Sequence, residues 1–195
     1  MLKLLLALVF LGGCAYADDP HTAAAAKKAA PGGSAVSADR FSCVPPAGWE
    51  VTRDRAKEGK TRIQKLELAG PGADKAPVLI YAAFYGAGNT SFAGYEDFIE
   101  RNSKNILGET VSETEKFSPV KKITLSGKKA FKFDSEIKEY LHPESKSEES
   151  VVIKEDFYVV PAGDGFFVLH YYSPASAFKK HLPVFKKFVA ACKLR

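Results

Sequence analysis

Apolar residues along the chain fall into short runs with two periods, one typical of strands and one typical of helices. The stretch PVLIYAAFY at 77–85 is apolar on both faces, which predicts a central strand covered on both sides. Apolar and charged residues alternate at 131–137, so that strand is expected to have one face in water. Two further strands, 151–160 and 166–172, flank PAGDG, whose Asp-Gly pair is typical of a hairpin. Shorter strands are expected at three earlier places: 41–44, 49–51 and 63–68.

Two helices are predicted from the spacing of apolar side chains. One stripe has its members at Tyr95, Phe98, Ile99 and Ile106. Pro183 lies inside a second, terminal stripe and is expected to kink or split that helix. One central and one terminal helix among strands indicate an α+β fold, and the two-faced central strand favours helices on both sides of the sheet. The terminal stripe shows clear helical periodicity and comprises Phe178, Leu182, Phe185, Val189 and Cys192.

The N-terminus has a different pattern, a single lysine followed by the apolar run LLLALVF. A membrane-spanning helix needs about 20 apolar residues, so this shorter run indicates an export signal instead. The segment LGGC at 11–14 is similar to the bacterial lipobox, and Cys14 is therefore the expected lipidation site, which anchors the protein in the cell envelope facing the periplasm. Ala15-Tyr16-Ala17 offers the alternative of cleavage after Ala17 and secretion to the periplasm.

Composition separates three parts of the chain: the signal at 1–14, a tether at 15–39 and a domain at 40–195. The tether is rich in Ala, Gly and Pro and has almost no large apolar side chain, so it cannot bury enough surface to fold. The remaining segment has the length of one ordinary domain. The net charge of +5 is spread over mixed charges, and nucleic-acid binding, which needs a concentrated basic stripe, is not expected.

Once Cys14 is lipidated or removed, two cysteines remain in an oxidising compartment, where disulfides persist. Cys43 and Cys192 allow one pairing. Closing that loop would contribute about 4 to 5 kcal/mol in the chain-entropy model. Two buried free thiols are the alternative.

No pattern for catalysis, a metal site or a cofactor is found. The four histidines are scattered, and none stands in a metal-ligand spacing: His21, His142, His170 and His181. The glycine-rich segment GAGNTS at 86–91 has Ser where a dinucleotide-binding turn has its third glycine, so it is interpreted as a loop before a helix. Nucleophile-elbow spacing is absent as well. We therefore assign no catalytic residue and do not expect an enzyme.

Two segments resemble PsbP-like domains, a family that includes many small bacterial lipoproteins. FSCVPPAGW at 41–49 is similar to the first strand and Pro-Gly-Trp turn of the family, and 167–185 is similar to its closing strand and helix. The resemblance implies an antiparallel sheet sandwiched between helices, and roles in binding or assembly rather than catalysis. Cys192 stands where relatives often carry an aromatic residue, which is compatible with Cys43 and Cys192 being neighbours.

The expected function is that of a non-catalytic, lipid-anchored envelope protein that binds an unidentified protein partner or assembles a complex. The alternative is a periplasmic carrier or sensor of a small ligand. Its cleft would lie between sheet and helix and would be lined by Tyr81, Tyr85, Tyr171 or Tyr172.

Overall fold

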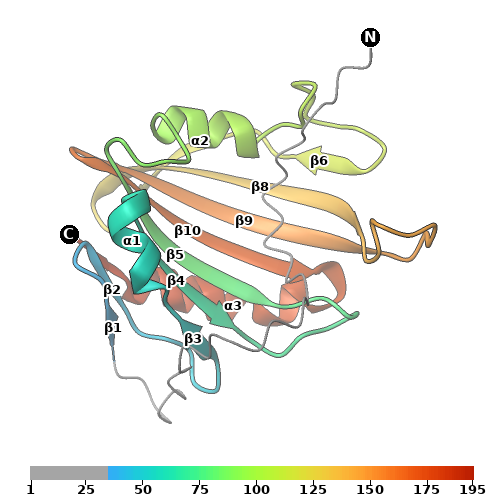
Figure 1. Ribbon diagram of the computed structural model, residues 1–195, viewed down its shortest axis with the longest axis horizontal. Coiled ribbons are helices and arrows are strands. Elements are labelled where there is room, and N and C mark those ends of the chain that lie inside the picture. Colours follow the sequence, from blue (N-terminus) through green and yellow to red (C-terminus); the bar gives the residue numbers. More distant parts are fainter. Residues whose placement is uncertain (1–34) are drawn as a thin grey trace.

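The computed structural model describes residues 35–195, so the signal, Cys14 and most of the predicted tether lie outside the described residues. An antiparallel sheet of eight strands forms the centre of the molecule, with helices on both of its faces (Figure 1). The predicted α+β class and the sheet between helices are thereby confirmed.

Three helices are described: α1 (Arg55–Thr61), α2 (Tyr95–Asn102) and α3 (Ala175–Ala191). The strands of the large sheet are β3 (Glu50–Thr52), β4 (Ile63–Ala69), β5 (Leu79–Gly86), β6 (Glu115–Phe117), β7 (Lys121–Leu125), β8 (Lys128–Tyr140), β9 (Ser150–Ala162) and β10 (Gly165–Pro174). Their spatial order is β3-β4-β5-β10-β9-β8-β6, and β7 pairs with β8. The chain forms β3 to β5 on one side of the sheet, crosses to β6 at the other edge and returns to β10 beside β5. A second sheet has three strands, β1 (Val36–Ser37), β2 (Phe41–Cys43) and β11 (Lys193–Leu194).

The predicted hairpin joins β9 and β10, two long neighbouring strands of the sheet. Ala162 at the end of β9 pairs with Gly165 at the start of β10, so Gly163 and Asp164 form the turn. Gly165 has φ +151°, and a Cβ there would lie 2.1 Å from the carbonyl oxygen of Tyr85. Only glycine fits this position, because a side chain there would clash with the neighbouring strand β5.

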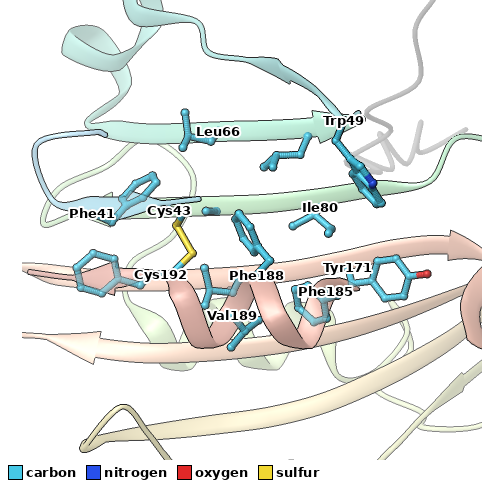
Figure 2. Close-up of a cluster of buried hydrophobic side chains, with 14 of the residues drawn as sticks. Phe41, Cys43, Trp49, Leu66, Ile80, Tyr171, Phe185, Phe188, Val189 and Cys192 are labelled. Atoms are coloured by element: carbon cyan, nitrogen blue, oxygen red, sulfur yellow. A yellow bond between two sulfur atoms is a disulfide. The ribbon is translucent and has the colours of Figure 1, made fainter. Parts of the chain in front are cut away.

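One face of the sheet is covered by α3. Phe185, Phe188 and Val189 of the helix pack with Ile80 and Leu66 of the sheet in a single buried cluster (Figure 2). Burying large apolar side chains of this kind is the main stabilising contribution to folding.

The expected split of this terminal helix is wrong, because α3 is one helix with Pro183 inside it. Pro183 lies on the exposed side. The carbonyl that loses its hydrogen-bond donor at a helical proline can therefore be hydrated, which makes the proline tolerable here.

The opposite face is covered in part by α2, whose Phe98 contacts an aromatic cluster of Phe92, Phe157 and Phe166. The predicted helix was too long: α2 ends at Asn102, and Ile106 is 78% exposed outside it. Just beyond the helix, the side chain of Asn105 accepts hydrogen bonds from the backbone N–H groups of two residues that follow it. Such local bonds compete with helical ones and favour a turn.

The folded part also begins earlier than the predicted boundary at residue 40. Val36–Ser37 pairs with β2, and Ala38 is buried in the core under α3. Helix α1 was not predicted, because none of its residues is buried and it therefore carries no apolar stripe.

Cys43 and Cys192 form a disulfide, with their Cα atoms 4.2 Å apart (Figure 2). Both are buried, and β11, which follows Cys192 directly, pairs with β2. The bond therefore links the first and last parts of the described fold. Within residues 35–195, no helix is long and apolar enough to cross a membrane.

Candidate functional site

The four tyrosines named from the sequence do not line one cleft. Tyr81, Tyr85 and Tyr172 lie on the α2 side of the sheet, whereas Tyr171 lies on the α3 side because successive residues of a strand face opposite ways. The ring of Tyr171 is fully buried, and its hydroxyl donates to the backbone carbonyl of Phe178 at 3.1 Å. The expected tyrosine-lined cleft is therefore not formed as a single site.

Tyr85 packs under α2 rather than at an open cleft. Its ring contacts Phe92 and Phe98 and stacks on Phe166 with centroids 4.9 Å apart. Burial raises the pKa of Tyr85 to about 12, because the phenolate would lose its hydration there. We therefore assign Tyr85 a role in packing beneath α2.

Tyr81 belongs to a row of stacked rings that crosses four neighbouring strands. Centroids are 5.2 Å apart between Tyr81 and His170, 4.1 Å between His170 and Phe157, and 4.7 Å between Phe157 and Phe133. The Nζ atom of Lys65 lies 4.1 Å from the Tyr81 centroid and extends the row to a fifth strand by a cation–π contact. Cross-strand pairing places these side chains in line.

His170 and Glu155 form the most polar part of this face. The Nε2 atom of His170 lies 2.9 Å from one carboxylate oxygen of Glu155, and the Ser135 hydroxyl donates to the other at 2.6 Å. Burial alone would raise the pKa of Glu155, but these two hydrogen bonds and the charge of His170 outweigh it and lower the pKa below its ordinary value.

The arrangement does not activate a nucleophile, because Ser135 donates to Glu155 and not to the histidine that would serve as its base. His170 also lines neither of the two hollows described below. We interpret the Ser135–Glu155–His170 network as a polar contact that holds β8, β9 and β10 together.

A groove lies between α2 and the segment that joins β6 to β7. Its volume is about 410 Å³. Tyr95 of α2 and Phe131 of β8, which stack with centroids 5.4 Å apart, contribute aromatic surface, and Ile99, Pro119 and Val120 add aliphatic surface. Its polar lining residues are Glu96, Glu100, Ser103, Lys104, Thr110 and Ser118.

A turn at residues 105–109 adjoins this groove, since the residues on either side of it, Lys104 and Thr110, both line the groove. Ile106 and Leu107 in the turn are each 78% exposed, and Val111 just beyond it is 65% exposed. We name Ile106, Leu107 and Val111 the apolar turn. Such adjoining exposed aliphatic side chains are typical of interaction sites.

The turn is held by its own hydrogen bonds. The Asn105 side-chain oxygen accepts from the N–H groups of Leu107 and Glu109 at 3.0 and 2.9 Å, and Gly108 donates to the Asn105 carbonyl. Gly108 has φ +82°, a conformation that favours glycine. The two aliphatic side chains are therefore presented on an ordered backbone.

The α2 side of the groove and the apolar turn carry net negative charge in a chain of positive charge, whereas Lys121 and Lys122 follow the opposite wall. Residues 95–115 contain six acidic and two basic residues, whereas the whole chain has a net charge of +5. Arg101 pairs with Asp97 and Lys104 pairs with Glu100. The remaining acidic residues of the segment form no ion pair with any described residue, and they are Glu96, Glu109, Glu113 and Glu115.

A second, smaller hollow of about 210 Å³ lies on the α3 side, beside Asp156 of β9 and Lys132 of β8. Lys132 pairs with Asp156 at 3.2 Å, and burial raises the pKa of Asp156 against the opposing effect of that lysine. Among residues 35–195, no group of three or more His, Cys, Asp or Glu side chains is arranged to hold a metal ion.

Comparison with known proteins gives structural similarity only. No family model and no curated protein sequence matches the chain. The solution structure of cyanobacterial PsbP from Synechocystis is similar with a TM-score of 0.48 and 6% identity, covering 86% of this chain and 95% of that one. The crystal structure of the Pseudomonas aeruginosa protein PA94 is similar with a TM-score of 0.49 and 12% identity, covering 84% of this chain and 97% of that one.

Sequence reasoning missed the groove and the apolar turn. The apolar spacing places Ile106 in a helix stripe and does not distinguish the neighbouring Leu107 and Val111. Two features of the sequence could have indicated this site. Residues 95–115 are acidic, and Ile106 and Leu107 are aliphatic residues directly before Gly108, which favours a turn.

Proposed function

We propose that this protein is a lipid-anchored protein of the bacterial cell envelope that binds another protein and has no catalytic activity of its own. The observation that supports binding most directly is the apolar turn beside the groove at α2. Exposed aliphatic surface of this kind is costly in water unless a partner covers it. Ser135 and Glu155 of the polar network around His170 line the second hollow, but at about 210 Å³ it has about half the volume of this groove.

The lipid anchor in this proposal depends on Cys14, which lies outside the described residues. Mass spectrometry of the membrane fraction is expected to find a mature N-terminus at Cys14 carrying acyl chains. A mature chain that begins at Asp18 would contradict the anchor and leave a secreted periplasmic protein.

The binding role can be tested in intact cells with a photo-crosslinking amino acid in place of Leu107. The matched control carries the same amino acid in place of Tyr140, which is 46% exposed on the other face of the sheet. We expect one reproducible protein adduct from position 107 and none of the same mass from position 140. The adduct should be lost when Ile106→Ser and Val111→Ser are added. No reproducible adduct at position 107 would contradict the proposal.

The alternative, a carrier or sensor of a small ligand, is favoured by one observation. The groove volume of about 410 Å³ lies within the range that small-molecule sites occupy, roughly 300 to 1,000 Å³. Native mass spectrometry of protein purified from its source distinguishes the two. A retained small molecule that is lost in Phe131→Ala would favour the carrier.

A further inference from the structure

We propose that the groove and the apolar turn receive a basic amphipathic helix of the partner protein. This inference rests on the proposed function and names the chemistry of the partner at the same site.

The walls of the groove favour a helix over an extended peptide. One wall is the surface of α2, whose backbone groups are used within the helix, and the other includes Pro119, which has no N–H group. An added strand needs a row of free backbone donors and acceptors, and these walls do not supply one. They supply side chains instead, with Tyr95 and Ile99 one helical turn apart on α2.

The apolar turn extends this surface beyond the end of the groove. Leu107 and Val111 add aliphatic contacts beside Thr110, which lines the groove. Because the turn at 105–109 is fixed by the Asn105 bonds, little conformational entropy is lost when a partner packs on it. A helix with one apolar face can cover groove and turn together.

The charge of the site indicates which side chains the polar face of that helix should carry. Glu96 lines the α2 side of the groove, and Glu109 and Glu113 flank members of the apolar turn in sequence. None of the three forms an ion pair among the described residues, so this side of the site attracts lysine and arginine. The same carboxylates repel an anionic lipid surface. A helix with one apolar face and one basic face would pack on the apolar surface and pair with the carboxylates.

The probe for this inference is a 14-residue helical peptide of leucine and lysine, with an otherwise identical peptide of leucine and glutamate as its control. Titration of the folded protein at low salt is expected to show binding of the lysine peptide and none of the glutamate peptide. Leu107→Ser should weaken binding at least tenfold, and Glu113→Gln should weaken it about twofold to fivefold and reduce its salt dependence.

Matched variants exclude binding elsewhere on the protein. Tyr140→Ser removes an exposed apolar residue on the other face, and Glu148→Gln removes an unpaired charge from the loop between β8 and β9; neither should change the affinity. Because Leu107 is exposed, Leu107→Ser is expected to keep the thermal midpoint of the wild type, and Val111→Ser serves as a second variant.

Equal binding of the two peptides, or lysine-peptide binding unaffected by Leu107→Ser and Val111→Ser, would overturn the inference. Its failure is distinguishable from failure of the proposed function. If the crosslink at position 107 captures a partner through an acidic or an extended segment, the proposed protein binding is supported, whereas the proposed basic helix is contradicted.

Discussion

At the scale of single residues, the most consequential polar contacts of the sheet are those of Glu155. Its carboxylate is nearly enclosed by the sheet and is satisfied by His170 and Ser135, which come from the two flanking strands. A buried charge without partners would be strongly destabilising. Removing His170 or Ser135 would therefore leave the buried carboxylate of Glu155 with fewer hydrogen bonds and lower the free energy of unfolding.

Substituting His170→Asn is expected to lower the free energy of unfolding at pH 7 by about 2 kcal/mol, because a hydrogen bond to a charged group is lost. The pKa of Glu155 lies below its ordinary value of 4.5, so its contribution to stability is present above pH 4.5 and is lost as the pH falls through the lower folded value. The variant should show a weaker loss of stability on acidification. Urea unfolding between pH 7 and pH 3 measures both effects, with the exposed His142→Asn as control; identical curves for the two variants would contradict the prediction.

Tyr85 supports a second prediction at this scale, in the alkaline range. Its pKa is raised from 10 to about 12 by burial, so the folded state holds the phenolic proton more tightly than the unfolded chain does. Stability from this group is complete below pH 10 and is lost as the pH rises from 10 towards 12. Tyr85→Phe is expected to flatten the fall of the thermal midpoint above pH 10, and a wild-type slope in this variant would show that another group is responsible.

At the scale of elements, helix length is set by what each helix can bury. Helix α3 keeps an apolar face against the sheet over its whole length and continues through Pro183. Helix α2 buries Phe98 and then ends, because Asn102 and Asn105 hydrogen-bond to local backbone groups. The end of α2 is what places Ile106 and Leu107 in a turn beside the groove.

Replacing the exposed helical proline, Pro183→Ala, is expected to stabilise the protein by about 1 to 2 kcal/mol. The change restores a backbone N–H in the interior of α3, and the gain is smaller than the full difference in helix propensity, about 3 kcal/mol, because proline also restricts the unfolded chain. Chemical denaturation against the exposed Lys186→Ala as control measures it. An unchanged or lower stability would indicate that Pro183 is already accommodated without cost.

At the scale of the whole molecule, the disulfide connects the two ends of the described fold. Cys43 and Cys192 are 149 residues apart, and the bond lies between β2 and the end of α3, next to the small sheet that those ends form (Figure 2). A crosslink over such a long loop restricts the unfolded chain more than the folded one.

Replacing both cysteines by alanine is therefore expected to lower the free energy of unfolding by about 2 to 5 kcal/mol. Denaturant unfolding of the variant and of the wild type, each with and without reductant, measures the effect. The variant should be insensitive to reductant. If full reduction in denaturant leaves the free energy of unfolding of the wild type unchanged, the disulfide does not stabilise the fold.

The sequence by itself determined seven of the described strands, the hairpin and the class of fold, but not the short strands β1, β6, β7 and β11. Two-faced apolar residues at 77–85 and Asp164-Gly165 are local signals, because they depend on strand periodicity and on the backbone conformation that glycine permits. The number of cysteines and the expected compartment allowed one pairing, and the structure decided between that disulfide and two free thiols.

Only the tertiary structure decided which side chains meet. Tyr171 and Tyr172 are adjacent in sequence yet lie on opposite faces of the sheet, so they cannot line the same cleft. The contact of Glu155 with His170 and the groove between α2 and Val120 join residues that are distant along the chain. Their placement depends on strand register and helix length, and both are set by the packing of the whole domain rather than by any short pattern.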